Sequence, residues 1–264
     1  MKKLFLLLFL ILFSFQVQAS GLLNSFWFAA GGAFDYDDIA NRELHLIAES
    51  LTGSYNDGDA LTASPGWPDD TTNYNYNTIG GTPTLETGEL NSLAIVDFIG
   101  SSSERVRDTS PNIPSSNKWT IAYVLKTPTS AAQVYLLRSN SSDTFILKRN
   151  TNDYDFLATN DVVTLDTGNF TPSVGASNWQ VIIWVVDFTA GAARIYINST
   201  TAEQTPSSST DSTDQVQTYY NIPTNTGYPD IQVAEFLVYN GTAATNEECG
   251  SLMTHLTNKY GISI

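Results

Sequence analysis

The sequence predicts an all-β protein: two antiparallel sheets packed as a jelly-roll sandwich, with one short helix at the C-terminal end. Three observations lead to this prediction. Short segments with period-two alternation recur from Leu90 onward, separated by turn residues. One of them, Trp179–Asp187, is apolar on both faces, as a strand covered on both sides must be. The clearest helical periodicity closes the chain.

The C-terminal segment combines a strand, a turn and a helix. Residues 231–239 are mostly apolar on both faces, and Asn240-Gly241 forms a turn. Thr245 and Glu248 have the spacing of a capping box, and Gly261 suits a left-handed helix end. The apolar residues between these caps recur at spacings of three and four: Cys249, Leu252, Met253, Leu256 and Tyr260. The pattern predicts a helix with one buried face.

The remaining strands are expected at residues 93–98, 119–125, 134–138, 144–149, 154–158, 162–165 and 193–197. Residues 55–81 are rich in Asn, Asp, Gly and Pro and are expected to be mostly loop. Long ordered loops are frequent places for function. Four tryptophans, Trp67, Trp119, Trp179 and Trp184, are predicted in the core.

Residues 1–19 are predicted to be a secretory signal peptide. Lys2 and Lys3 precede an apolar run at 4–15, and Ala19 is a suitable residue before the cut. The run is too short to span a bilayer. We expect cleavage before Ser20 and export to the extracellular space or periplasm, with no membrane attachment afterwards.

The exported chain is expected to consist of an N-terminal arm, residues 20–40, and one domain, residues 41–264. The arm contains an aromatic patch, Phe26-Trp27-Phe28, which is either a strand tucked against the domain or a contact for an assembly partner or a second copy. The single Cys249 excludes an intramolecular disulfide and is expected in the core.

The chain is strongly acidic. Its formal charge of −15 becomes −17 when Lys2 and Lys3 are removed, and ten of its 12 basic residues remain. Phosphate binding depends on Lys and Arg, so this composition argues against nucleic acid and anionic membranes as partners. The acidity is explained either by solubility outside the cell or by cation binding.

Nine short segments, spread from Leu44 to Gly261, are compared together with one known family of domains. They are Leu44–Ala48, Asp57–Asp59, Trp67–Asp69, Pro83–Leu85, Leu90–Leu93, Phe98–Gly100, Trp179–Asn198, Val233–Tyr239 and Lys259–Gly261. Together they resemble the laminin-G-like jelly-roll domains of the concanavalin A-like lectin and glucanase superfamily. The resemblance implies the fold, but the superfamily includes lectins, hydrolases, lyases and structural modules. His45-Leu46 stands where the family often has an aromatic, so the opening strand is expected to be irregular.

No catalytic residue is predicted. Retaining glycoside hydrolysis needs two carboxylates about 5 Å apart, and the Glu-x-Asp runs of the glucanases do not occur here. Glu235 stands alone in an apolar strand and is expected to accept hydrogen bonds from a neighbouring loop. His45 and His255 are too few for a histidine metal site or a Ser/His/Asp triad, and His255 is expected on the helix surface.

Two kinds of binding site remain open. Calcium takes oxygen ligands, and the long loop offers Asp57, Asp59, Asp69 and Asp70, which fit a plain turn equally well. Sugars bind exposed aromatic rings with polar groups beside them. The candidates for sugar binding, each of which could also be an ordinary loop or strand-edge residue, are Tyr74, Tyr76, Asp153, Tyr154, Gln217, Tyr219, Tyr220 and Tyr228.

These observations favour a secreted, non-catalytic module that binds a glycan, a cell-surface polysaccharide or another surface partner. One alternative is a structural or adhesion protein of a virion or surface appendage, assembled through the N-terminal arm. A third hypothesis is a polysaccharide-cleaving enzyme with a site that the motifs above do not cover.

Overall fold

The structure is a computed structural model. It describes residues 34–99, 104–108, 116–126, 132–138, 144–150, 153–160, 163–174, 178–206, 208–209, 220–222 and 230–264. The predicted signal peptide and most of the predicted arm lie outside these residues. The contacts divide the chain into a unit up to Asp35 and a unit from Tyr36, and the fold below is that of the second unit. No helix among the described residues is long and apolar enough to cross a membrane.

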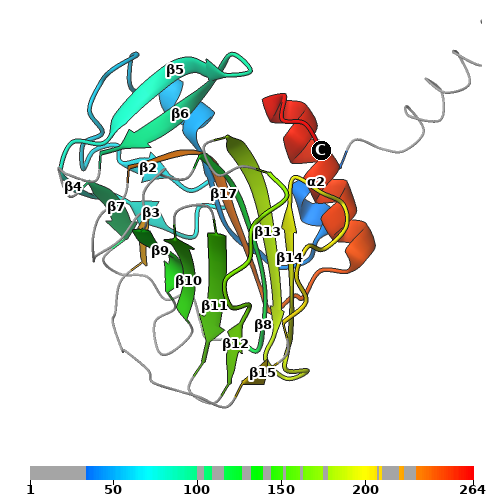
Figure 1. The fold of residues 1–264 in the computed structure, drawn as a ribbon. Coiled ribbons are helices and arrows are strands. Elements are labelled where there is room, and N and C mark those ends of the chain that lie inside the picture. The colour runs from blue at the N-terminus through cyan, green and yellow to red at the C-terminus, as the bar shows by residue number, and fades with distance from the viewer. Residues whose placement is uncertain are drawn as a thin grey trace, which may run out of the picture. The chain divides into compact units, whose positions relative to one another are not determined.

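Two antiparallel sheets form the domain (Figure 1), which confirms the predicted fold class. The larger sheet has the order β14-β13-β8-β17-β6-β5, and β1 also pairs with β17. Its strands are β1 (Arg42–Ile47), β5 (Thr84–Leu90), β6 (Leu93–Phe98), β8 (Lys118–Lys126), β13 (Trp179–Asp187), β14 (Ala192–Ile197) and β17 (Ile231–Asn240). The smaller sheet has the order β15-β12-β11-β10-β9. Its strands are β9 (Ala132–Arg138), β10 (Thr144–Asn150), β11 (Asp153–Thr159), β12 (Thr164–Asp166) and β15 (Ser208–Ser209).

Short elements surround the two sheets. Three strands form a small sheet, namely β4 (Thr78–Gly80), β7 (Arg105–Asp108) and β16 (Tyr220–Ile222), and two pair as a ribbon, β2 (Trp67–Pro68) and β3 (Asn75–Tyr76). Two 3-10 turns, η1 (Tyr36–Asp38) and η2 (Ala48–Gly53), flank β1. The predicted loop at 55–81 therefore contains the three short strands β2, β3 and β4.

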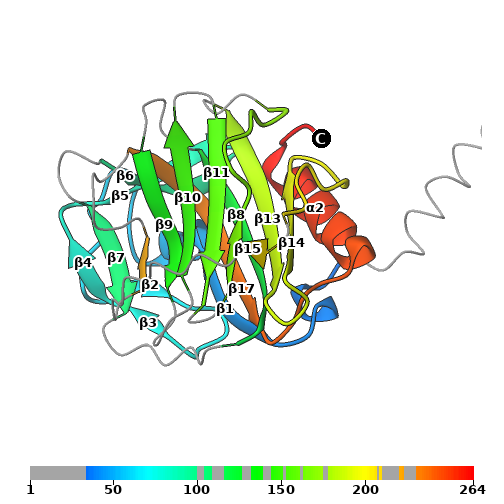
Figure 2. The ribbon, with the colours of Figure 1, turned by 60° about the horizontal axis from the view of Figure 1, so that its bottom comes forward.

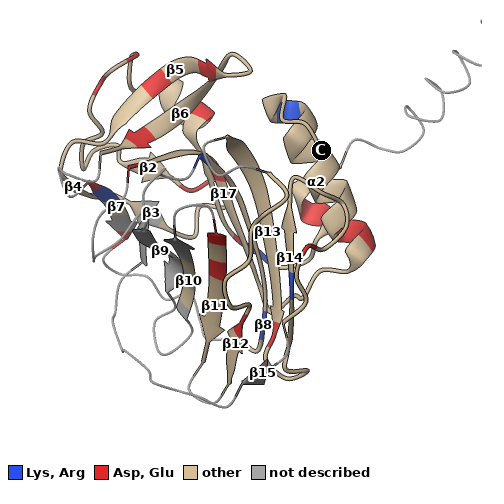
Figure 3. Ribbon diagram, in the orientation of Figure 1, with Lys and Arg blue, Asp and Glu red and all other residues tan. Residues whose placement is uncertain are grey.

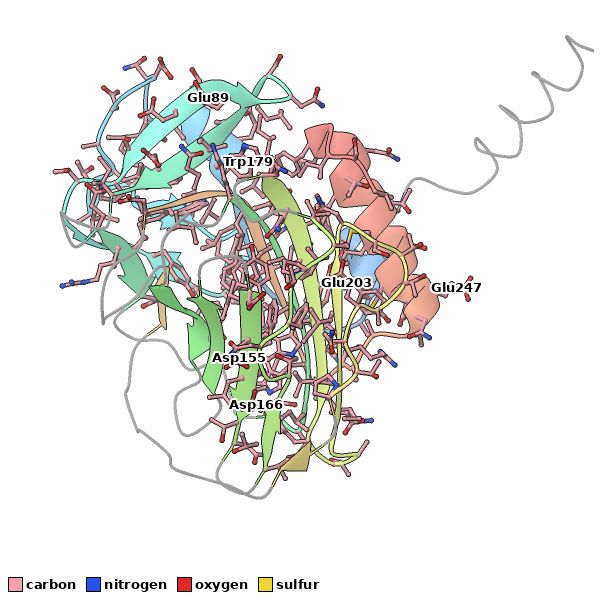
Figure 4. All side chains as sticks on the ribbon, in the orientation of Figure 1. Glu89, Asp155, Asp166, Trp179, Glu203 and Glu247 are labelled. Atoms are coloured by element: carbon pink, nitrogen blue, oxygen red, sulfur yellow. The ribbon has the colours of Figure 1, made fainter. Side chains whose placement is uncertain are left out.

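The core lies between the two sheets and is built on aromatic rings. Phe145 of β10 packs edge to face against Trp184 of β13, with ring centroids 5.3 Å apart. Phe156 of β11 packs against the same indole, with ring centroids 5.2 Å apart. Such tilted pairs add to the burial of apolar area that drives folding. Trp67, Trp119 and Trp184 are buried as predicted. The prediction was wrong for Trp179, which begins β13 at the sheet end and is only half-buried (Figure 4).

Within the described residues one α-helix is present, α2 (Asn246–Tyr260), and it packs on the outer face of the larger sheet beside β13 and β14 (Figure 2). The predicted capping box is present, since the Thr245 hydroxyl accepts from Glu248 N and the Glu248 carboxylate accepts from Thr245 N. Gly261 ends the helix at φ 64°, a conformation that suits glycine. The five apolar residues of the predicted stripe are all buried.

The opening strand β1 is irregular, as was expected from the departure from the family pattern at His45-Leu46. Its register with β17 shifts between Arg42 and Leu44, and Leu44 and Leu46 then face the core. His45 between them points to the outer face, because successive strand residues alternate. There it is fully buried beneath other groups and contacts the ring of Tyr36, with ring centroids 4.4 Å apart.

Glu235 of β17 is the centre of a buried polar cluster on this outer face. Nε2 of His45 donates to one carboxylate oxygen at 2.6 Å, while Nζ of Lys259 and the Tyr260 hydroxyl donate to the other at 2.7 Å each. Glu235 and His45 have no exposed surface. The predicted partner of Glu235 was a neighbouring loop, but these donors come from β1 and from the last turn of α2. The carboxylate therefore connects a strand pair to the helix.

The contacts within this cluster shift the pKa values of its titratable groups. Burial alone would raise the pKa of Glu235, but the His45 hydrogen bond and the Lys259 charge outweigh it and hold that pKa at about 2. Burial and the nearby carboxylate raise the pKa of the Tyr260 hydroxyl far above its ordinary value. His255, predicted on the helix surface, is instead half-buried, with Nε2 3.1 Å from the Tyr36 hydroxyl.

We predict that Glu235→Gln lowers the free energy of unfolding by about 3–5 kcal/mol at pH 7, because it leaves the half-buried Lys259 ammonium group and the buried Tyr260 hydroxyl without their anionic partner. Urea unfolding followed by circular dichroism measures the change. Glu89→Gln, an exposed carboxylate at the end of β5 (Figure 4), is the matched control and should change it by less than about 1 kcal/mol.

The same carboxylate predicts a pH dependence. Its folded pKa of about 2 lies below the ordinary value of 4.5, so its contribution is complete above about pH 5 and is lost as the pH falls toward 2. The wild-type protein should lose stability over this range more steeply than Glu235→Gln. Parallel pH profiles of the two proteins would contradict the assigned role of Glu235.

Candidate functional site

A pocket of about 260 Å³ lies on the outer face of the larger sheet, beside the start of α2. Lys118 of β8, Asp187 of β13 and Arg194 of β14 contribute its charged groups. Residues 118, 187 and 194 share this face because their chain neighbours Trp119, Val186 and Ala193 face the core. The other wall is the segment Ala243–Thr245, which leads into the helix.

The wall formed by the segment before α2 is held in place by hydrogen bonds to the first residues of β8. Gly241 N donates to the Lys118 carbonyl at 2.9 Å, and the buried Thr120 hydroxyl donates to the Thr242 carbonyl at 2.9 Å. Ala244 N in turn donates to that hydroxyl at 2.9 Å. Because Thr120 is both donor and acceptor here, the loop backbone has one well-defined position against β8.

The opposite wall is the turn of the β13–β14 hairpin. One carboxylate oxygen of Asp187 accepts from Ala190 N at 2.9 Å and shapes the turn. The other lies 3.5 Å from Nζ of Lys118, whose side chain is 49% exposed. An ion pair this open to solvent is weak, so the ammonium group of Lys118 is available to other acceptors.

Arg194 forms the floor between the two walls and is half-buried. Its Nη2 donates to the Ala244 carbonyl, and its buried Nε has no hydrogen-bond partner. Among the described residues, no carboxylate forms a salt bridge with this guanidinium. The positive charge of Arg194 is therefore partly withdrawn from water without a counter-ion.

The cysteine behind this floor is not a nucleophile. Cys249 is fully buried, and its sulfur lies 4.0 Å from the Ala244 carbonyl. Burial raises the pKa of its thiol to about 11, which the nearby Arg194 charge only partly offsets. Cys249 is a core residue, as predicted.

Two of the predicted sugar-binding tyrosines cannot stack on a ligand. Tyr76 is 1% exposed and Tyr154 is 0% exposed, and both rings belong to the core. The pairing of β3 with β2 turns Tyr76 inward beside Trp67, and Tyr154 points inward from β11, where its hydroxyl donates to Gln180 at 2.6 Å. The expectation that these rings are exposed was wrong, because each points from its strand toward the core.

The other sugar-binding candidates are dispersed or lie outside the description. Tyr74 is half-buried against the core and its hydroxyl donates to Glu43, while Asp153 accepts from the Thr171 hydroxyl at 2.6 Å. Gln217, Tyr219 and Tyr228 lie outside the described residues. The backbone of Tyr220 belongs to β16, but its side chain is not described. A common binding surface made from these residues stays a prediction.

The four predicted calcium ligands are each used in a separate set of hydrogen bonds. Asp57 accepts from the backbone and hydroxyl of Thr87, which lowers its pKa, and Asp59 accepts from Asn56. Asp70 pairs with Arg42 at 3.4 Å. The part of the chain that the structure describes contains no cluster of three or more His, Cys, Asp or Glu side chains suited to a metal. The geometry favours the turn-forming explanation for these residues.

Asp69 is the most extensively bonded of the four. It is 5% exposed, and its carboxylate accepts from four backbone amides at 2.8–3.1 Å, those of His45, Thr71, Asn73 and Tyr74. These bonds hold the 69–74 turn against β1. Asp69 is therefore a structural anchor of the long loop.

The pocket itself was missed by the sequence prediction. Its charged residues come from three strands that are distant in sequence, and only the sheet order brings them together. A signal existed: a basic residue occurs inside the otherwise apolar segment Ala192–Ile197 of a chain with only 12 Lys and Arg residues. Such a residue on a covered strand face is unusual and indicates a specific environment.

We predict that Asp69→Asn lowers the free energy of unfolding by about 2–3 kcal/mol, because backbone amides lose a charged acceptor. The adjacent Asp70→Asn, whose side chain is 55% exposed, is the control and should cost less than about 1 kcal/mol. Thermal and urea unfolding of both variants measure the difference. Equal effects of the two substitutions would contradict the anchoring role.

No protein-family model matches the sequence, and the curated proteins compared with it include no match. Solved structures do resemble its fold. The binding domain of Paraclostridial Mosquitocidal Protein 1 has a TM-score of 0.58 at 13% identity, over 83% of this chain and 53% of that one. The binding domain of botulinum neurotoxin DC in complex with SialylT has a TM-score of 0.55 at 14% identity, over 82% and 52%.

A third similar structure is domain 4 of AbnA, a GH43 extracellular arabinanase from Geobacillus stearothermophilus, in complex with arabinotriose. Its TM-score is 0.53 at 14% identity, and the match covers 81% of this chain and 99% of that one. The chain spans about half the length of the two toxin domains and almost the whole of the arabinanase domain. At these identities the similarity is one of fold: this chain has the β-sandwich architecture found in these three domains.

Proposed function

We propose that this protein is an exported, lectin-like module that binds a glycan without cleaving it. The observation that carries the proposal is the pocket between the β13–β14 hairpin and the start of α2, which combines a small volume with polar groups on a rigid frame. The laminin-G-like resemblance of the sequence and its predicted signal peptide are consistent with an exported binding domain.

The volume of the pocket suits one sugar ring. Its 260 Å³ is slightly below the roughly 300–1,000 Å³ of sites for drug-sized ligands. Lys118 offers N–H donors, Asp187 offers a carboxylate acceptor and Thr245 offers a hydroxyl at the rim. Sugar hydroxyl groups need such a mixture of donors and acceptors on an already ordered surface, because preorganisation reduces the cost of binding.

The similar structures support the same class of function. One is a toxin binding domain in complex with SialylT, and another is a domain of an arabinanase in complex with arabinotriose. The second of these structures holds a bound oligosaccharide, so a fold of this kind can carry a glycan site. The fold alone does not identify the ligand of this chain.

The carboxylates near the pocket are unsuited to glycoside hydrolysis. That reaction needs an acid and a second carboxylate on either side of the scissile bond. Among the described lining residues Asp187 is the one carboxylate, and it is engaged with the hairpin turn and with Lys118. Glu235 is fully buried and accepts three hydrogen bonds from other side chains.

Binding and cleavage are tested together. The full chain is expressed with its leader and purified after export, and its N-terminus is determined by mass spectrometry, which is expected to begin at Ser20. The protein is titrated against a panel of neutral and acidic polysaccharides while new reducing ends are assayed. We expect binding to at least one polysaccharide and no new reducing ends.

A substitution that fills the pocket tests whether the glycan binds there. Ala192→Trp introduces an indole at an exposed lining position and is expected to weaken glycan binding by about tenfold or more, a loss of roughly 1.4 kcal/mol. Ala63→Trp, at an exposed turn outside the pocket lining, is the control and should bind as wild type.

Each other outcome has a clear meaning. Cleavage would show an enzyme, and unchanged binding by Ala192→Trp would place the glycan elsewhere. Failure to bind any polysaccharide would overturn the proposal and favour the assembly hypothesis. Deletion of residues 20–34 should then change the mass of the protein in solution.

A further inference from the structure

We infer that the pocket selects an acidic sugar, whose anionic substituent lies between Arg194 and Lys118. This inference rests on the proposed glycan-binding function and specifies the chemical class of the ligand. It depends on the charges of the lining residues, on the lack of a carboxylate partner for Arg194 among the described residues, and on the polar side chains of Asp187 and Thr245.

The residues that line the pocket carry a net positive formal charge, although the protein is acidic. Figure 3 shows acidic residues spread over strands, loops and α2, with few basic residues among them. The chain has 27 acidic and 12 basic residues, yet the described lining contains two basic side chains and one carboxylate. Its local formal charge is therefore +1, against −15 for the chain. Such a site attracts an anion that the rest of the surface repels.

Arg194 has the strongest requirement for an anion. Arg194 is half-buried, and among the described residues its buried Nε has no hydrogen-bond partner and no carboxylate pairs with the guanidinium. The Nη2 bond to the Ala244 carbonyl fixes the group in the floor without cancelling its charge. Withdrawing a cation from water is unfavourable unless an anion compensates it. A bound carboxylate would supply that compensation, and the planar guanidinium matches it geometrically.

Lys118 provides a second, adaptable cation at the rim. Its side chain is 49% exposed, and its contact with Asp187 is 3.5 Å long. Because this pair is weak and solvated, the ammonium group can turn to a ligand anion at little cost. Arg194 thus offers the ligand a fixed contact at the floor of the pocket. Lys118 offers a flexible contact at its rim.

The remaining groups explain why the ligand is a sugar acid rather than a small inorganic anion. Asp187 would repel a free anion that filled the pocket, whereas it can accept hydrogen bonds from sugar hydroxyl groups. The Thr245 hydroxyl, which accepts from Glu248 N, keeps its hydrogen and can donate it to the ligand. A ring that carries one anionic substituent and several hydroxyl groups matches both parts of this lining.

Paired sugars test the inference. Each acidic sugar is compared with its neutral partner, glucuronate with glucose and galacturonate with galactose; the members of a pair differ only in the carboxylate at C6. The 6-sulfates of glucose and galactose are added to distinguish binding of a sulfate from binding of a carboxylate. Binding of each to the full processed chain is measured by NMR titration. We expect an anionic form to bind about tenfold or more tightly than its neutral partner, and this preference to fall as salt screens the charges.

Variants at the two ends of β8 provide the matched control. Lys118→Gln removes a positive charge from the pocket and should reduce the preference for the acidic sugar by about threefold to tenfold, with little effect on the neutral one. Lys126→Gln removes the same charge from the other end of the strand and should leave both affinities unchanged. Arg194→Lys keeps the charge but loses the planar fork, and should weaken carboxylate binding.

The outcomes separate this inference from the proposed function. If polysaccharides bind but no acidic sugar is preferred, or if Lys118→Gln and Lys126→Gln behave alike, the acidic-sugar inference is wrong and glycan binding stands. If neither sugars nor polysaccharides bind, both are wrong. Tighter binding of the sulfates than of the carboxylates would support the anionic site and identify sulfate as its anion.

Discussion

The buried carboxylate of Glu235 is the constraint on which much of this structure depends. A charge with no exposed surface must be compensated from within the protein. His45, Lys259 and Tyr260 supply the compensation, and they come from the first strand of the larger sheet and from the last turn of the chain. The two ends of the domain must therefore assemble on β17 before this charge is satisfied. The irregular register of β1 is part of this arrangement, because it directs His45 to the outer face.

The contacts at the C-terminal end of α2 also fix the position of its N-terminal end. With its last turn tied to Glu235 and its apolar face buried, the helix begins at a fixed place beside β13 and β14. The segment before it must then cross the end of β8, where Thr120 satisfies its backbone. That crossing leaves a small space in front of Arg194, which becomes the pocket. The first turn of α2 is itself acidic, with Glu247 (Figure 4) and Glu248, so the positive character of the pocket comes from strand residues.

Much of the fold could be predicted because its signals are local. Capping residues, turn dipeptides and period-two alternation act over a few residues, and the helix, its caps and the core strands were found where those signals stand. The side chains of the long loop were predicted less well. Tyr76 and Tyr154 lie among polar residues in the sequence, which suggested exposure, but strand pairing turns both rings inward. Trp179 shows the opposite error, since an apolar residue at a strand end is not covered on all sides.

The candidate site could not be predicted in the same way. Lys118, Asp187 and Arg194 meet only because β8, β13 and β14 are neighbours, and strand order is a property of the whole fold. That Nε of Arg194 has no hydrogen-bond partner within the described part of the chain is likewise visible only once its surroundings are known. Chemical-shift mapping with a bound acidic oligosaccharide tests the account most directly. We predict shifts in the backbone amides of residues 190–194 and 243–245, on both walls of the pocket. Shifts confined to the 69–77 loop and residues 153–154 would contradict it.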